Sequence, residues 1–347
     1  MARASKRVTI REVAEATGLS QAAVSYALRG IQVSEETVER VRRAAAELGY
    51  EAHPMARALA SGRTSMVGVL CGSLEDLWQQ QLAVAIGRAL LDRDQYALIL
   101  DAGGDADREL RLARQLHDQR VDGLIVSPLD PSAGLWGELA EKMPIVTIGD
   151  SLRDAPTAGE VLFDNRAGVT LALEHLRDLG HRRVAVLTPT QPITPDRPAD
   201  VHVSAEAERL GLRVQIVASQ HALPVATETA RGILSEADRP TALFCFSDSI
   251  AYGAYAAAGR LGLRIPADLS VMGYDSHPVS GLLSPALTTV DWNTQAIVRA
   301  AARLVMAAIE GESHRRRIVQ KPVLSAGAST GPPAAGPPAA ASSAVLG

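Results

Sequence analysis

The chain contains 347 residues, of which 47% are apolar, 21% are charged and only 3% are aromatic, and its formal net charge is −4. This length predicts two or three domains, and the composition fits globular domains with cores of Ala, Val and Leu. No stretch of about 18 apolar residues occurs, and no long apolar run follows the basic N-terminal residues, so we expect neither a membrane span nor a signal peptide.

The two cysteines indicate the redox compartment. Cys71 and Cys245 both lie in apolar, strand-like runs. We expect reduced core cysteines rather than a disulfide or a redox pair, and therefore a cytoplasmic protein. The sequence contains no P-loop, no H-E-x-x-H and no paired Cys/His spacing, so no cofactor and no metal ion are expected.

Residues 8–30 have the pattern of two short helices joined by a tight turn. Thr9 can cap the first helix, and Glu12, three residues later, completes a capping box. Gly18 ends this helix because glycine adopts the left-handed cap conformation at little cost. Ser20 caps the second helix, whose apolar stripe consists of Ala23, Val24, Ala27 and Leu28. The pattern predicts the helix-turn-helix of DNA-binding proteins; the alternative is a helical pair that only packs.

The second helix is expected to lie in the major groove with its N-terminal residues facing base edges. Gln21 can pair with adenine through two hydrogen bonds, and Ala22 can touch a thymine methyl group. Arg29 is the expected phosphate contact. The candidate DNA contacts of this segment are Thr9, Ser20, Gln21, Ala22, Ser25, Tyr26 and Arg29.

A third helix follows from Ser34, which is its predicted N-cap. Acidic residues come early in this helix and arginines come later, an order that suits the helix dipole. Its apolar stripe consists of Val38, Val41, Ala45 and Leu48, and Gly49 ends it. We therefore expect residues 1–50 to form a small helical headpiece. Residues 1–63 carry a net charge of +3 and the rest of the chain −7, so DNA affinity is expected in this N-terminal part.

Residues 51–63 form a connector that is expected to contain a short helix starting at Pro54. Such a helix is too short to be stable alone in water. We expect it to fold only when it is docked on DNA beside its counterpart from a second chain. A plain linker is the alternative.

From residue 64 the pattern changes to short apolar runs that alternate with helical stretches. Two such series follow each other, which predicts two doubly wound α/β lobes with parallel sheets. The expected strands are 66–71, 96–100, 123–126, 145–148, 183–187, 213–217, 242–246 and 269–273. The expected helices are 77–92, 107–119, 133–141, 166–179, 202–210, 225–236 and 249–261. Ligands of such sheets bind outside the carboxyl ends of the strands, here in a cleft between the lobes.

The end of the chain has two further parts. Residues 288–322 are expected to cross back between the lobes, with a hinge strand at 287–290 and a one-sided helix at 294–311. Residues 326–347 are rich in Ala, Gly, Pro and Ser without periodicity, which predicts a disordered tail. The core therefore spans residues 64–325.

The N-terminal motifs resemble those of the lac repressor (LacI) family of transcription regulators. The matching residues include Val8-Thr9-Ile10, Gly18-Leu19-Ser20, Ala23-Val24-Ser25, Leu48-Gly49-Tyr50 and the run from His53 to Ala60. The resemblance implies a core like a periplasmic sugar-binding protein. It also implies a hinge helix that enters the minor groove with Leu59 wedged between base pairs, and the candidate contacts there are His53, Ala56, Leu59 and Ala60. Many members of the family carry Arg where this chain has Tyr26, so the base read at that position is left open.

Four residues are candidates for contact with a small-molecule effector. Asp275 follows the strand 269–273, where a carboxylate can accept two hydrogen bonds from sugar hydroxyls, as the family's matching residue does; turn capping is the alternative. Ser247 follows the strand 242–246, where many family members have Asn, and the neighbouring Asp248 is a candidate helix cap. The resemblance places Arg197 on a ligand-binding arginine, although the family's other residues of that loop are absent. Asp150 is the fourth candidate.

The sequence also contains features of two functions other than DNA binding. Gly149-Asp150-Ser151-Leu152 spells the motif of GDSL esterases, and Asp178 and His181 have a D-x-x-H spacing. Both lie in mid-domain, whereas esterases have the serine motif at the start and D-x-x-H near the end. A stand-alone solute-binding protein would need only the core. The sequence therefore predicts no enzyme but a dimeric, operator-binding regulator, most simply a repressor, controlled by a sugar-like effector; whether the effector releases or promotes DNA binding is left open.

Overall fold

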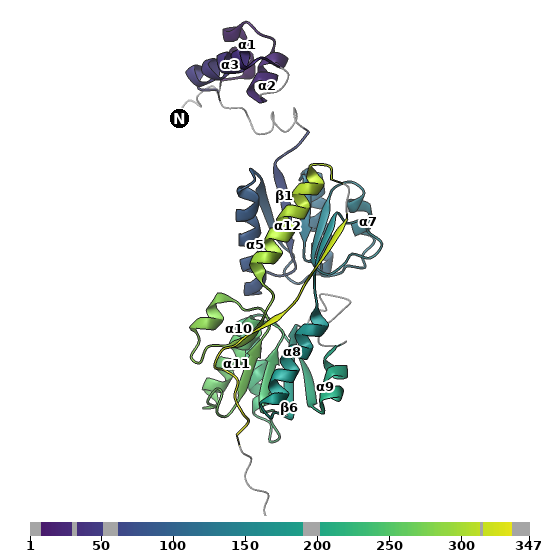
Figure 1. The fold of residues 1–347 in the computed structure, drawn as a ribbon, viewed down its shortest axis with the longest axis vertical. Coiled ribbons are helices and arrows are strands. Elements are labelled where there is room, and N and C mark those ends of the chain that lie inside the picture. Colours follow the sequence, from purple (N-terminus) through teal and green to yellow (C-terminus); the bar gives the residue numbers. More distant parts are fainter. Residues whose placement is uncertain (1–7, 30–32, 51–61, 190–201, 313–314, 335–347) are drawn as a thin grey trace, which may run out of the picture. The chain divides into compact units, whose positions relative to one another are not determined.

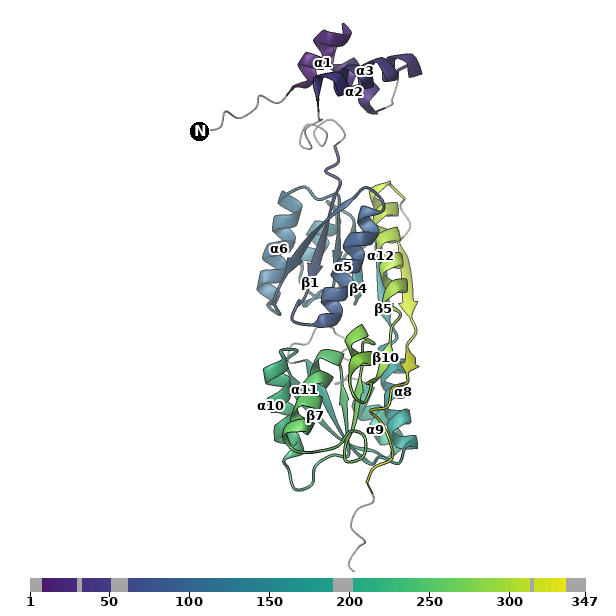
Figure 2. The same cartoon turned by 90° about the vertical axis from the view of Figure 1, so that its left-hand side faces the viewer.

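The computed structural model describes residues 8–29, 33–50, 62–189, 202–312 and 315–334, and Figures 1 and 2 show two perpendicular views. The chain divides into two compact units, Met1–Ser65 and Met66–Gly347. We call the helical part of the first unit the headpiece and the second unit the core.

The headpiece contains three helices, α1 (Ile10–Thr17), α2 (Gln21–Arg29) and α3 (Glu35–Leu48). They pack around a small apolar cluster of fully or nearly fully buried side chains: Val13, Ala14, Val24, Ala27, Val41 and Ala45. Each helix contributes two of these residues, as helical spacing of apolar positions requires. The predicted three-helix arrangement is confirmed.

The ends of these helices follow from their capping residues. The carboxylate of Glu12 accepts hydrogen bonds from the Thr9 amide at 2.6 Å and from the Thr9 hydroxyl at 2.9 Å. Gly18 ends α1 with a φ of 65°, a conformation that favours glycine. The hydroxyl of Ser34 accepts from the Thr37 amide at 3.3 Å and caps α3.

The core contains two six-stranded sheets. We call lobe 1 the sheet with the order β11-β5-β4-β3-β1-β2, and lobe 2 the sheet with the order β12-β10-β9-β8-β6-β7. Every recorded strand pair is parallel except β10 with β12. The strands of lobe 1 are β1 (Met66–Cys71), β2 (Tyr96–Asp101), β3 (Gly123–Val126), β4 (Ile145–Gly149), β5 (Gly159–Phe163) and β11 (Arg316–Gln320). Those of lobe 2 are β6 (Arg183–Pro189), β7 (Arg213–Ser219), β8 (Ala242–Cys245), β9 (Ser270–Gly273), β10 (Thr288–Asp291) and β12 (Val323–Ser325).

Helices cover both faces of each sheet, as parallel strands with buried apolar runs require. Lobe 1 carries α5 (Leu77–Leu91), α6 (Ala106–Asp118), α7 (Leu135–Ala140) and α12 (Thr294–Ile309). Lobe 2 carries α8 (Asn165–Asp178), α9 (Ser204–Leu210), α10 (Leu223–Leu234), α11 (Asp248–Arg260) and the short 3-10 helix η2 (Pro278–Leu282). Glycine permits the close approach of α12, because a Cβ on Gly123 would lie 2.9 Å from Val305. This architecture confirms the predicted fold class.

The chain crosses between the lobes three times. It leaves lobe 1 after β5 to enter α8, returns after β10 to enter α12, and leaves again between β11 and β12. Figures 1 and 2 show the result, with α12 beside α5 of lobe 1 although it follows all the helices of lobe 2 in the sequence. The sequence pattern missed β5, β11 and β12. Charged residues interrupt the apolar pattern of two of them, Glu160 in β5 and two arginines at the start of β11, and β12 has only three residues, so periodicity alone did not reveal them.

The C-terminal segment differs from the expected disordered tail. Residues 326–334 pack on lobe 2, where the Ala328 amide donates to the carbonyl oxygen of Ala286 at 2.8 Å and the Val271 amide donates to that of Ser329 at 3.0 Å. Ser329 is fully buried. The prediction of disorder from composition is wrong for residues 326–334, because small residues also fit a narrow groove where larger side chains would clash. Residues 335–347 lie outside the described residues.

Two further expectations concern the cysteines and membrane spans. Cys71 and Cys245 are free and buried, and burial raises the pKa of both thiols, that of Cys71 to about 12. The thiolate form, which reacts, is therefore disfavoured. Among the described residues, no helix combines the length and apolar character that a membrane crossing demands.

Candidate functional site

The first turn of α2 is exposed on one side and anchored on the other. Ser20, Gln21 and Ala22 are exposed, Tyr26 is 40% exposed, and Ser25 is partly exposed. Val24 and Ala27 on the opposite face are fully buried in the headpiece core. The exposed side therefore presents one amide, hydroxyl groups and one phenol, which are groups that read base edges and phosphates.

The orientation of α2 is fixed by its own turn. The Leu19 amide donates to the carbonyl oxygen of Ala14 at 3.1 Å, and the Ser20 hydroxyl accepts from the Ala23 amide at 3.1 Å. Ser20 therefore acts as a helix cap. The Thr9 hydroxyl donates its hydrogen bond to the Glu12 carboxylate. The side chain of Arg29 and the residues His53, Ala56, Leu59 and Ala60 lie outside the described part of the chain.

Three of the four candidate effector residues follow the carboxyl ends of strands in the core. Asp150 comes after β4 in lobe 1, and Ser247 and Asp275 come after β8 and β9 in lobe 2. Ser247 and Asp275 are buried, whereas Asp150 is partly exposed. Arg197 lies outside the described residues. The structure brings Ser247 and Asp275 together in lobe 2, whereas Asp150 belongs to lobe 1.

Asp248 organises the loops around Asp275. Its Oδ1 accepts from the Tyr274 amide at 2.9 Å and the Thr289 hydroxyl at 2.6 Å. Its Oδ2 accepts from the His277 amide at 2.8 Å and the Ser280 hydroxyl at 2.6 Å. With these charge-assisted bonds the carboxylate is satisfied inside the protein. It does more than cap the next helix, because it ties α11 to the loop after β9 and to the strand β10.

Asp275 is held by α11. Its Oδ2 accepts from the Asp248 amide at 2.9 Å, and its own amide donates to the Thr289 hydroxyl at 3.1 Å. Burial raises the pKa of Asp275 well above its ordinary value, and the negative charges of Asp76 and Asp248 raise it further. Turn capping, the alternative considered from the sequence, is therefore part of its role.

Asp76 belongs to this site although the sequence gave no indication of it. It is the N-cap of α5 in lobe 1, where its Oδ1 accepts from the Trp78 amide at 3.2 Å. The same oxygen accepts from the hydroxyls of Ser247 at 3.3 Å and Ser249 at 3.4 Å, both in lobe 2. The N-termini of α5 in lobe 1 and α11 in lobe 2 thus meet at the Asp76 carboxylate. The positive end of each helix dipole stabilises this negative charge. In sequence, an Asp before a helix indicates a cap and nothing further.

A continuous chain of aromatic rings lies between the lobes. Trp78 contacts Phe163, whose ring centroid is 5.1 Å from that of Trp292. Trp292 contacts Tyr274, and Tyr274 contacts Phe244 and Phe246. All three phenylalanines of the chain are in this cluster. Next to Trp78, the Leu77 amide of lobe 1 donates to the Ser249 hydroxyl of lobe 2 at 3.2 Å. Apolar contact and hydrogen bonding therefore both hold the lobes together.

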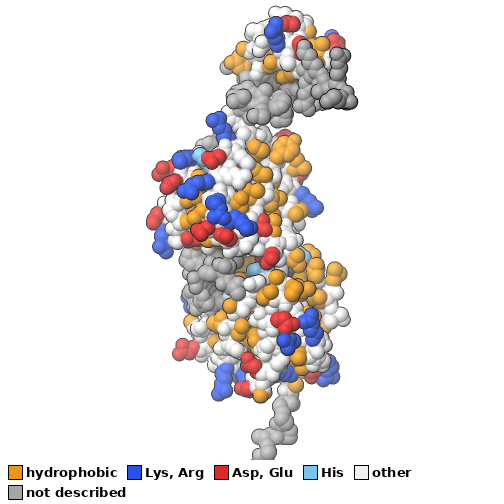
Figure 3. Space-filling model, turned by 180° about the vertical axis from the view of Figure 1, so that it is seen from behind, with side chains coloured by type: hydrophobic (Ala, Val, Ile, Leu, Met, Phe, Trp, Pro, Cys, Tyr) orange, Lys and Arg blue, Asp and Glu red, His pale blue; other side chains and the backbone are white. Residues whose placement is uncertain are grey.

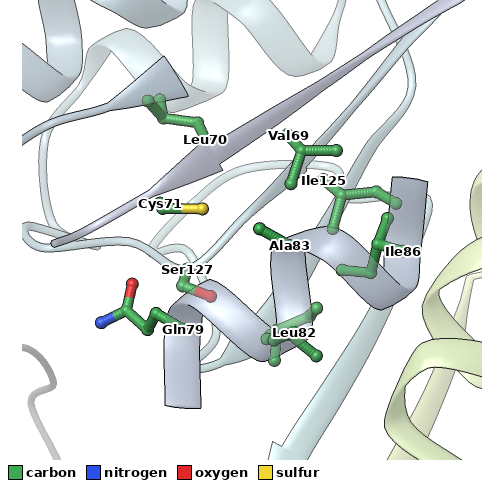
Figure 4. Close-up of a pocket in the computed structure, with 10 residues that line it drawn as sticks. Val69, Leu70, Cys71, Gln79, Leu82, Ala83, Ile86, Ile125 and Ser127 are labelled. Atoms are coloured by element: carbon green, nitrogen blue, oxygen red, sulfur yellow. The ribbon is translucent and has the colours of Figure 1, made fainter. Parts of the chain in front are cut away.

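A small cavity of about 10 Å³ lies under the carboxyl end of β1 (Figure 4). Side chains of β1 and α5 surround it, among them Cys71, Gln79 and Ala83. Gln79 accepts from the Gly72 amide at 2.9 Å, which fixes the loop between β1 and α5. The cavity has room for about one water molecule, so it is too small for a sugar-sized effector.

The three groups of the hydrolase motif have separate partners in the structure. The hydroxyl of Ser151 accepts from Arg317 at 3.2 Å in lobe 1. His181 is buried in lobe 2, where it contacts Thr241 at 2.8 Å and the carbonyl oxygen of Gly331 at 3.0 Å. Asp178 pairs with its neighbour Arg177. The three groups of a triad must be within hydrogen-bond reach of one another, and here they form no such chain.

Known proteins share both parts of this chain. Residues 9–53 match the model of the bacterial regulatory proteins of the lacI family, and residues 173–330 match the periplasmic binding protein-like domain. The ribose operon repressor of Haemophilus influenzae is 32% identical over 287 residues, which cover 81% of this chain and 86% of that protein. The HTH-type transcriptional repressor PurR of Aliivibrio salmonicida is 28% identical over 319 residues, covering 90% of this chain and 95% of the relative.

Solved structures are also similar to this chain over both of its parts. The lac repressor dimer bound to operator and the anti-inducer ONPF matches with a TM-score of 0.80 and 25% identity. This match covers 94% of the present chain and 100% of that chain. Both the headpiece and the core are therefore included in the similarity.

Proposed function

Because the chain belongs to the lacI family of bacterial regulatory proteins, we propose that it is a transcription repressor that binds operator DNA as a homodimer and responds to a sugar-like effector. The observation that carries the proposal is the exposed first turn of α2, which presents Gln21 on a helix whose opposite face is buried. Helix-turn-helix dimers place such helices in successive major grooves of a palindromic site.

We assign the chain a headpiece at residues 1–50, a connector at 51–63 and an effector-binding core from residue 64. The core extends beyond the expected end at residue 325, because residues 326–334 are bonded to lobe 2. The connector is proposed to act as the hinge helix that the family resemblance implies, with Leu59 as its minor-groove contact.

The surface of the core supports a dimer. Lobe 1 exposes apolar side chains on α5 and on the adjacent edge strand β2, and lobe 2 does so on α10, on the edge strand β7 and on η2. These residues are Val84, Leu91, Tyr96, Ile99, Ile216, Leu223, Val225, Val279 and Leu282. Apolar side chains lie among charged ones on both lobes in Figure 3. Several large apolar groups on neighbouring elements are typical of a protein interface.

The effector is proposed to bind at the carboxyl ends of the strands, with Asp275 as its central contact. A carboxylate at this position can accept two hydrogen bonds from neighbouring hydroxyl groups. The relative named ribose operon repressor supports a sugar-like ligand. The separated groups of the hydrolase motif support a regulator without catalytic activity.

The proposal is tested with the purified full-length chain. Duplexes selected from a random pool should converge on a palindrome, and binding should weaken as salt rises because phosphate contacts release counterions. Pentoses and hexoses are then screened by thermal shift, since a ligand that binds the folded state raises its stability. A chain that selects no duplex at low salt, or that stays monomeric, would contradict the proposed function.

A further inference from the structure

Asp76 and Asp275 are two buried carboxyl groups that approach each other from different lobes. Asp76 is 5% exposed and Asp275 is 8% exposed. The hydroxyl of Ser247 donates to Oδ1 of Asp76 at 3.3 Å, and the amide of the next residue, Asp248, donates to Oδ2 of Asp275 at 2.9 Å. Ser247 also lies beside the Asp275 carboxyl group. The bond between Asp76 and Ser247 joins the two lobes, so it exists only while the lobes are together.

The number of hydrogen atoms available for bonds among Asp76, Ser247 and Asp275 indicates how many protons the two carboxyl groups carry. Ser247 has one hydroxyl hydrogen and can donate it to only one of the two carboxyl groups. Its oxygen can accept a bond from the other, but only if that carboxyl group carries a proton. A single proton on the pair completes the chain from Asp275 through Ser247 to Asp76. Without it, one carboxylate oxygen faces a hydroxyl oxygen with no hydrogen between them.

Within the described ranges, one carboxylate, one phenol and two imidazoles face the pair. From α11 the site is faced by Asp248 and Tyr252, from the loop before α10 by His221, and from the loop after β9 by His277. No Lys or Arg within the described ranges forms an ion pair with Asp76, Asp248 or Asp275. His221 lies 3.8 Å from Oδ1 of Asp76 and has no hydrogen-bond partner among the described residues.

We propose that Asp76 and Asp275 form a proton-dependent latch, in which one proton is bound when the lobes of the core close and is released when they part. Two like charges held together in a buried site cannot both ionise at little cost. Closing the lobes brings Asp76 to Asp275, and a proton removes the repulsion and supplies the missing hydrogen. Opening returns both groups to water, where each ionises separately.

The sign of the pH dependence follows directly. The closed form binds one more proton than the open form, so a lower pH favours closure. The elevated pKa of Asp275, caused first by burial and then by the charge of Asp76, agrees with this direction. Because one proton is involved, the ratio of closed to open molecules should change by at most about tenfold per pH unit.

The test measures lobe closure without DNA or effector, so it is independent of the proposed function. The full-length chain is labelled with 5-fluorotryptophan, and 19F NMR spectra are recorded from about pH 5 to about pH 8.5. The chain has three tryptophans, and Trp292 reports closure because its ring contacts Phe163 of lobe 1 and Tyr274 of lobe 2. We expect the signal of the closed form to grow as the pH falls.

Variants identify the groups responsible. Asp76→Asn should make the ratio of closed to open forms nearly independent of pH, whereas Glu75→Gln, at an exposed neighbouring residue, should leave the dependence intact. His221→Gln should also preserve it. If Asp76→Asn does not fold, Asp76→Ser keeps a helix cap without a charge. A flat profile in the parent chain, an unchanged slope in the Asp76 variant, or a slope lost with His221 would each overturn the latch.

Discussion

The hydroxyl of Thr289 donates a 2.6 Å hydrogen bond to Oδ1 of Asp248. Thr289 lies in β10, the strand that leads the chain back to α12 in lobe 1, whereas Asp248 begins α11 in lobe 2. The loop that carries Asp275 is therefore bonded to one of the three crossings between the lobes. The Thr289 hydroxyl also accepts from the Asp275 amide at 3.1 Å, and the Trp292 indole donates to the Tyr274 carbonyl oxygen at 3.0 Å, so several bonds link the candidate effector site to this crossing.

Asp248→Ala should destabilise the core strongly. The substitution leaves buried amides and hydroxyls of four other residues without their acceptor, and each unsatisfied group costs about 1–3 kcal/mol. We expect the free energy of unfolding to fall by more than about 3 kcal/mol, measured by denaturant titration. Glu141→Gln, at an exposed position, is the matched control. A loss under about 1 kcal/mol would show that these bonds contribute little.

Asp275→Asn should reduce the affinity for the effector while operator binding without effector persists. The amide oxygen still accepts from the Asp248 amide, so the fold is kept, but the charge that receives sugar hydroxyls is lost. Hydrogen bonds to charged groups contribute about 1.5–3 kcal/mol. Their loss should therefore raise the dissociation constant roughly tenfold to 150-fold. Calorimetric titration with the sugar found in the thermal screen measures it. An unchanged affinity would remove Asp275 from the effector contacts.

Gln21→Ala should weaken binding to the selected operator by about 1–3 kcal/mol and relax the preference at one base pair. Gln21 is exposed in the first turn of α2 and contributes nothing to the headpiece core. Its loss should therefore leave the thermal stability of the chain unchanged. Fluorescence anisotropy with the selected duplex and with single-base variants of it tests this. Glu47→Gln, exposed on α3, should have no effect on base preference.

The sequence alone located the features that depend on neighbouring residues, but not the contacts between residues distant in sequence. Runs such as Gly123–Val126 were located from sequence because parallel strands buried on both faces must be continuously apolar. The helices of the headpiece were located because Thr9, Gly18 and Ser34 are capping residues that act on their own neighbours. The placement of Asp275 at the end of a strand followed from the same local logic.

Long-range contacts were beyond the reach of the sequence. Asp76 is a helix cap in any local interpretation, and only the folding of both lobes brings it to Ser247. The small, aperiodic neighbours of Ser329 predict a disordered tail, yet Ser329 is bonded to Val271 and Thr288. These partners are distant in sequence, and no period or motif records them.

His181→Gln should make stability less dependent on pH below neutrality. Burial lowers the pKa of His181, whose ring bonds Thr241, Ser270 and the C-terminal segment at Gly331. The unfolded chain then binds the proton more readily, so the stabilisation from neutral His181 is present above about pH 6.5 and is lost as the pH falls below it. The difference in free energy of unfolding between about pH 7.5 and about pH 5.5 should shrink in the variant and persist in His117→Gln, a surface control.

Tyr96→Glu should convert the dimer into monomers without destabilising the fold. Tyr96 is 64% exposed on the edge strand β2, so a charge there costs nothing in the monomer but is buried in the proposed interface. Val319 is 51% exposed on β11, the opposite edge of the same sheet, and Val319→Glu is the matched control. Light scattering after size-exclusion chromatography should give monomers for the first variant only. Since two headpieces must reach one palindrome together, the monomeric variant should also bind the operator at least about tenfold more weakly. If both variants remain dimeric, the contact surface lies away from β2.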